Sequence, residues 1–96
     1  MIVVTVTFDA LPGSRDRALE ILLGEAPEVR AHPGNLQFMP TRIAGSETGI
    51  LLHQVWEDEP AFTTYTAGPG FAAVGDALRP LMDGPPTRQV VRGEIA

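Results

Sequence analysis

Cysteine and lysine are both absent from this chain of 96 residues. The absence of cysteine excludes disulfides, thiolate metal sites and cysteine nucleophiles. The two histidines, His32 and His53, have no close carboxylate pattern beside them, which is weak evidence for a metal site. We therefore expect no bound metal.

Positive charge and long apolar runs are also scarce. The seven basic residues are all arginine, are scattered, and face twelve acidic residues, which gives a net charge of -5. Nucleic-acid binding needs clustered positive charge, and this chain lacks it. No apolar run is long enough to cross a bilayer, and the opening MIVVTVTF shows neither a basic leader nor a cleavage pattern. The sequence predicts a cytoplasmic protein that binds neither nucleic acid nor membrane.

The chain is short but rich in apolar residues. It shows no internal repeat and no linker, so we expect one domain over residues 1–96. Hydrophobic residues make up 44% of the chain, and a domain of this size leaves much apolar surface that one copy cannot easily bury. Burial against a second subunit is therefore favoured before any motif is considered.

The first half of the chain predicts a strand, a helix and a hairpin. Apolar alternation indicates a strand over residues 2–8, and apolar spacing after Ser14, a candidate cap, indicates a helix from Arg15. Pro27 should kink or interrupt this helix, because its ring clashes with the preceding turn and removes a donor. After a turn at 32–35, strands at 36–42 and 50–56 are joined by a loop at 45–49. Pro40 indicates an edge strand or a bulge.

The second half predicts two helices and a last strand. Asp58 is the candidate cap of a short helix that ends at the Gly-Pro-Gly break at 68–70. Apolar residues at 71, 74, 78 and 81 indicate a third helix, whose regular length Pro80 limits. A strand is expected from Thr87 to Ile95. The order β-α-β-β-α-α-β is the ferredoxin-like split βαβ pattern, an α+β fold with a four-stranded antiparallel sheet and helices on one face.

Both faces of this predicted sheet are apolar. One phase of the alternation holds Val4, Leu52, Trp56 and Val90, and the other holds Val3, Leu51, Val55 and Val91. Because helices cover only one face, the other face needs a second cover. A second sheet is the simplest one, so we expect a homodimer with sheet-to-sheet packing.

Five short motifs follow one another along nearly the whole chain. They are the opening strand with Pro12-Gly13, the turn Pro33-Gly34, the strand ending Val55-Trp56-Glu57-Asp58, the break at Pro69 before Phe71, and Leu81 with Gly84-Pro85-Pro86. In this order and spacing they resemble the antibiotic-biosynthesis-monooxygenase family. The resemblance implies a dimeric α/β barrel.

The same resemblance implies a reaction. The family includes oxygenases of aromatic polyketides and quinols that need no cofactor, so it implies a monooxygenase that oxidises a small aromatic, anthrone or quinone-like molecule with O₂. Where the family often has cysteine, glutamate, histidine and histidine, this chain has Asn35, Gln54, Tyr65 and Gly70. These departures keep an alternative open, a non-oxidative small-molecule-binding or cyclase-like homodimer of a biosynthetic pathway. The histidine ligand and first-strand asparagine of the haem-degrading relatives are missing, so haem degradation is not expected.

Three residues are candidates for catalysis. Trp56 ends a strand beside a helix, where its indole could stack on a planar ligand and its N–H could make a hydrogen bond. Tyr65 could donate to a developing oxyanion, although its high ordinary pKa makes it a weak base. His53 is an acid–base candidate because it is a histidine, but it alternates onto the face opposite Gln54 and Trp56. Each residue also has a purely structural alternative. Trp56 would be a core aromatic, Tyr65 a half-buried tyrosine and His53 a hydrogen-bonded histidine at the dimer interface.

A second group is expected to bind the substrate. Gln54 shares a face with Trp56, and the pair forms the expected floor of a pocket. Its walls would be Phe38, Phe62 and Phe71, and Arg79 could hold an anionic group of the substrate. Core packing is the alternative for the phenylalanines, and a solvated or ion-paired state is the alternative for the arginine.

Overall fold

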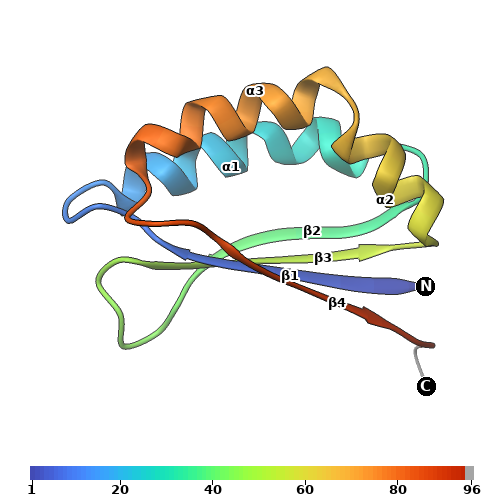
Figure 1. Cartoon of the computed structure of the whole chain (residues 1–96), viewed down its shortest axis with the longest axis horizontal. Coiled ribbons are helices and arrows are strands. Elements are labelled where there is room, and N and C mark those ends of the chain that lie inside the picture. The colour runs from blue at the N-terminus through green and yellow to red at the C-terminus, as the bar shows by residue number, and fades with distance from the viewer. Residues whose placement is uncertain (95–96) are drawn as a thin grey trace.

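The helices lie over one face of an antiparallel sheet (Figure 1). The computed structural model describes residues 1–94, and its elements are β1 (Ile2–Asp9), α1 (Arg15–Arg30), β2 (Asn35–Arg42), β3 (Gly49–Trp56), α2 (Glu59–Thr66), α3 (Pro69–Leu78), η1 (Arg79–Leu81) and β4 (Thr87–Arg92). The strand order is β2-β3-β1-β4, which confirms the ferredoxin-like α+β fold and places Pro40 on an edge strand. Ile95, the predicted end of the last strand, lies outside the described residues.

Pro27 does not interrupt α1, so the interruption considered for this position is not found. The helix continues past it, and the Ala31 N–H donates to the Pro27 carbonyl at 3.2 Å. Pro27 lies on the exposed side of the helix, whereas Leu22, Ala26 and Val29 are buried. Proline removes one helical hydrogen bond, but burial of the apolar residues on both sides of it stabilises the helix beyond that point.

The helix ends lie close to the residues that the sequence indicated. The Asp58 carboxylate caps α2 by accepting a hydrogen bond from the Ala61 N–H at 2.9 Å, as predicted. Ser14 occupies the N-cap position of α1, but its side chain makes no capping hydrogen bond. Regular helix in α3 ends at Leu78, and Pro80 falls in η1. None of the helices within residues 1–94 has the length and apolar character of a membrane span.

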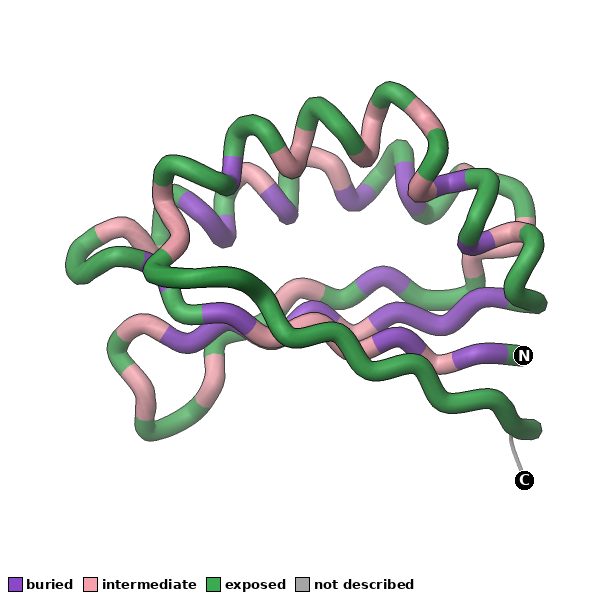
Figure 2. Tube along the Cα trace, viewed as in Figure 1, coloured by how far each residue is buried: buried purple, intermediate pink, exposed green. Residues whose placement is uncertain are grey.

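The core lies between the sheet and the helices, and buried positions on α1 and on the central strands face each other there (Figure 2). On β1 and β3 this row includes Val4, Ile50 and Trp56, none of which is exposed. By contrast, every residue of β4 is exposed. The layer between the sheet and the helices is therefore shielded from solvent beside β3 and more accessible to solvent beside β4.

Among the elements of residues 1–94, no helix lies on the opposite face of the sheet (Figure 1). Strand pairing puts Val3 opposite Val55 and, one residue on, Val4 opposite Gln54, so the two apolar phases lie on opposite faces as predicted. Val55 is buried, but Met39 and Val91 are 47% and 61% exposed. This face thus keeps an apolar surface that no element within residues 1–94 covers.

Candidate functional site

A cavity of about 150 Å³ lies between the sheet and the helices. It is lined by Val6, Phe8, Leu22, Phe38, Leu52, Gln54, Phe62, Tyr65, Phe71, Val74, Gly75, Leu78, Met82, Pro86 and Arg88. Only Gln54, Tyr65 and Arg88 in this set have polar side chains. A pocket with mostly apolar walls and a few polar groups is typical of sites for small organic molecules.

An aromatic cluster forms the end of the cavity under α2. The Tyr65 ring stacks on Trp56 with ring centroids 5.1 Å apart, and Phe71 meets the edge of Tyr65 at 5.5 Å. Phe62 lies 5.9 Å from Trp56. These contacts hold Tyr65 in one orientation, because the rings on both sides restrict its rotation.

Trp56 itself does not line the cavity. Its indole is completely buried, and Tyr65 covers the face on which a ligand was expected to stack. Its Nε1–H donates to Gln54 Oε1 at 3.0 Å. This bond fixes the orientation of the Gln54 amide, whose N–H₂ group is the hydrogen-bond donor that Gln54 brings to the cavity wall. Trp56 is therefore a positioning residue for Gln54 in this geometry.

The Pro33-Gly34 turn completes the cluster. Gly34 has a φ of +86°, and a Cβ at this position would collide with the Cβ of Ala61, so the turn needs glycine to approach α2. The turn brings His32 edge-on to Trp56 and Tyr65, with centroids 5.8 and 5.7 Å away. The aromatic contacts of His32 depend on tertiary packing, and no local pattern predicts them.

Tyr65 is a hydrogen-bond donor at ordinary pH. Burial, with a smaller contribution from the negative charge of Glu25, raises the pKa of Tyr65 to about 12. Burial and the neighbouring Glu28 also raise the pKa of Glu25. Tyr65 and Glu25 also border a second hollow of about 180 Å³. The phenol stays protonated until strongly alkaline pH, so it can donate a proton in a hydrogen bond but cannot serve as a base.

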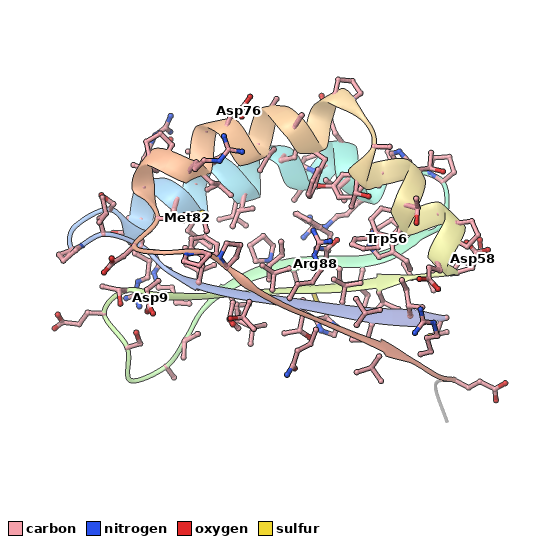
Figure 3. The ribbon with its side chains drawn as sticks, in the orientation of Figure 1. Asp9, Trp56, Asp58, Asp76, Met82 and Arg88 are labelled. Atoms are coloured by element: carbon pink, nitrogen blue, oxygen red, sulfur yellow. The ribbon has the colours of Figure 1, made fainter. Side chains whose placement is uncertain are left out.

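Arg88 is the site residue that the sequence did not suggest. It pairs with Val6 across β1 and β4, so its side chain leaves the sheet on the helix-covered side (Figure 3). Its Cζ lies 5.3 Å from the centroid of Phe62 and 5.9 Å from that of Phe71. The alternation of β4 is weak in sequence, and only the register with β1 shows which residues face the cavity.

The other predicted site residues divide into two groups. Phe38, Phe62 and Phe71 line the cavity with Gln54, as expected. His53 lies on the helix-free face, where its Nε2 is 3.0 Å from Gln37 Oε1. Arg79 is ion-paired with Asp76 at 2.9 Å and its side chain is 74% exposed. Neither His53 nor Arg79 lines the cavity, because sheet alternation directs the first away and the second lies on the outer side of the helix layer.

Residues that could hold a metal are not grouped together in the part of the chain that the structure describes. Within residues 1–94, no three histidine, aspartate or glutamate side chains come close enough to share a metal ion. The hydrogen-bonding groups of the cavity are the amide of Gln54, the phenol of Tyr65 and the guanidinium of Arg88. These groups suit oxygen atoms of an organic ligand.

Comparison with known proteins places this geometry in a family. The family model for antibiotic biosynthesis monooxygenase matches residues 1–77. No curated protein sequence matches the chain. Among solved structures, a candidate antibiotic biosynthesis monooxygenase from Deinococcus radiodurans has a TM-score of 0.91 at 21% identity, covering 100% of this chain and 95% of the other. One from Caulobacter crescentus has a TM-score of 0.91 at 23% identity, covering 98% and 90%. By the family match, this chain belongs to the antibiotic biosynthesis monooxygenase family.

Proposed function

We propose that this protein is a monooxygenase that oxidises a small aromatic, anthrone or quinol-like molecule with O₂ and needs no cofactor. Membership of the family supports the reaction class. The observation that carries the proposal is the cavity, whose walls are mostly apolar and whose three polar side chains, Gln54, Tyr65 and Arg88, each carry hydrogen-bond donors. A flat ring fits such walls, and donors stabilise an oxygen atom that gains negative charge.

In the proposed reaction the substrate supplies most of the chemistry. It loses a proton to become an enolate or phenolate, which passes an electron to O₂, and the two resulting radicals combine to form a carbon–oxygen bond. The product of this combination is a peroxide, which takes up a proton. Loss of the remaining hydrogen from the same carbon then breaks the O–O bond, so one oxygen atom stays as a ring carbonyl and the other leaves as water. The substrate supplies the electrons for this cleavage and ends as a quinone, so no outside reductant is needed. The protein orients the ring, excludes water, and donates from Gln54 and Tyr65 to the developing charge. Trp56 acts indirectly by holding Gln54.

A second function is favoured by a different observation. None of the cavity-lining residues within 1–94 is a base at neutral pH, because the pKa of Tyr65 is raised to about 12 and the other two polar groups are an amide and a guanidinium. A non-oxidative binder or a cyclase-like helper needs no such base. For an oxygenase, the substrate must be acidic enough to lose its proton to water.

Oxygen consumption separates these two functions. We expect protein-dependent O₂ uptake with at least one of a panel of anthrones and naphthoquinols, unchanged by a chelator or by added flavin. Val74→Phe should abolish the uptake because it places a ring in the cavity, whereas Ala73→Phe, on the exposed side of the same helix, should leave it intact. Binding without uptake above the protein-free rate across the panel would support the non-oxidative function instead.

We also propose that two copies pair through their helix-free sheet faces. Met39 and Val91 are exposed on this face, and an exposed apolar patch of this kind marks an association surface. The parent protein should sediment as a dimer, and the double change Met39→Glu and Val91→Glu should yield monomers, because it buries like charges against each other. Leu23→Glu, a charge on the exposed side of α1, is the matched control. A parent protein that sediments as a monomer at micromolar concentration contradicts this arrangement.

A further inference from the structure

The cavity contains a positive charge that nothing in residues 1–94 neutralises. Six of the seven arginines donate a hydrogen bond to a carboxylate or a backbone carbonyl in this part of the chain. Arg88 has neither kind of acceptor there, and its nearest aromatic neighbours are Phe62 and Phe71. No aspartate or glutamate lines the cavity with it. A guanidinium that faces an apolar cavity and has no carboxylate partner is suited to bind an anionic group of a ligand.

The surroundings of Arg88 favour recognition over structural support. It is exposed on an edge strand, so the fold does not depend on it for core packing. The two rings hold the guanidinium plane near the cavity by cation–π contact while leaving its N–H groups available. Residues 82 and 86, which also line the cavity, lie on the segment that leads into the same strand. The guanidinium therefore lies where a ligand's edge reaches solvent.

We propose that Arg88 selects a ligand with an ionised oxygen on its ring system, so that the natural substrate is a planar aromatic molecule with an acidic hydroxyl or a carboxylate at one edge. The ring occupies the apolar cavity, and the charged oxygen pairs with the guanidinium at the mouth beside β4. This inference rests on the proposed function and deepens it. With no base in the cavity, an arginine that stabilises the ionised form favours loss of the substrate proton.

Calorimetric titration with two matched pairs of probes tests this selectivity. The hydroxynaphthoquinone lawsone is ionised at neutral pH and its methyl ether is neutral, while naphthoate and naphthamide form the corresponding carboxylate pair. The parent protein should bind the ionised member of at least one pair roughly tenfold more tightly, the scale of one charge-assisted hydrogen bond. Preference within the first pair indicates an acidic hydroxyl, and preference within the second indicates a carboxylate.

Variants assign the preference to Arg88. Arg88→Gln should weaken binding of the ionised probe roughly tenfold and leave the neutral probe unchanged. Arg88→Lys should keep part of the preference, because it keeps the charge but loses the planar fork. Arg92→Gln is the control: it removes the same charge from the same strand, but that residue is already paired with Glu59. Circular dichroism establishes that each variant is folded.

Three results would overturn the inference: equal affinity within both pairs, a preference that survives Arg88→Gln, or no binding of any probe. None of these requires turnover, so the outcome is independent of the oxygen-uptake experiment. Ionised-probe preference without O₂ uptake keeps the role of Arg88 and removes the oxygenase. O₂ uptake without a preference for the ionised probe keeps the oxygenase and removes the role of Arg88.

Discussion

Trp56→Ala is expected to lower the free energy of unfolding by about 3–5 kcal/mol, the usual cost of removing a buried large aromatic side chain. Trp56 is completely buried and contacts Phe62, Tyr65 and His32, so its loss leaves a void under α2 that these rings cannot fill together. A domain of this size has a total stability of roughly 5–15 kcal/mol, so much of it would be lost. Urea denaturation followed by circular dichroism measures the change.

A conservative variant separates packing from hydrogen bonding. Trp56→Phe keeps an aromatic ring but leaves the buried Oε1 of Gln54 without its donor, which costs about 1–3 kcal/mol. Combining it with Gln54→Leu removes both partners, so the double variant should recover part of that loss. Additive effects in this double-mutant cycle would show that the buried hydrogen bond does not couple the two residues.

Tyr65→Phe is expected to reduce turnover of the proposed oxidation roughly 100-fold, the effect of removing one donor from an oxyanion site. The aromatic stack on Trp56 remains in the variant, so substrate affinity and stability should change little. This combination distinguishes a catalytic donor from a packing residue, because loss of packing would lower stability too. Steady-state O₂ uptake with the best substrate of the panel, together with urea denaturation, measures both.

Two controls accompany this variant. His53→Gln, on the helix-free face, should leave turnover unchanged, since His53 does not line the cavity. Tyr65 is the only tyrosine, so the ultraviolet absorbance of tyrosinate reports its ionisation directly. Titration should show a midpoint near 12, above the usual range, because burial favours the protonated phenol. An unchanged rate in Tyr65→Phe would remove this residue from the mechanism.

The fold was readable from local patterns, with two exceptions, the cap at Ser14 and the effect of Pro27 on its helix. Alternating β-branched residues predicted the strands, Asp58 predicted the start of α2, and Pro40 predicted an edge strand, because each signal depends on backbone chemistry near the residue itself. The interruption considered at Pro27 was not found, because that reasoning also used only the backbone chemistry near the residue. Its local effect on a helix is real, but buried residues on both sides of it outweigh that effect.

The candidate site was only partly readable. Strand parity correctly placed Gln54 inside and His53 outside, since successive side chains alternate between the two faces of a sheet. Parity could not show that Tyr65 covers the Trp56 ring, because that contact joins a helix to a strand. It also could not show that Arg88, and not the expected Arg79, lines the cavity.

The sequence by itself determined the order of the elements, the two apolar faces of the sheet, the absence of thiol chemistry and the family. All of these depend on residue type, on spacing within segments and on the order of the segments along the chain. The tertiary structure alone decided which donors line one cavity: Gln54 from β3, Tyr65 from α2 and Arg88 from β4. These residues are far apart along the chain, and only the pairing of β4 with β1 and the packing of α2 on the sheet bring them together.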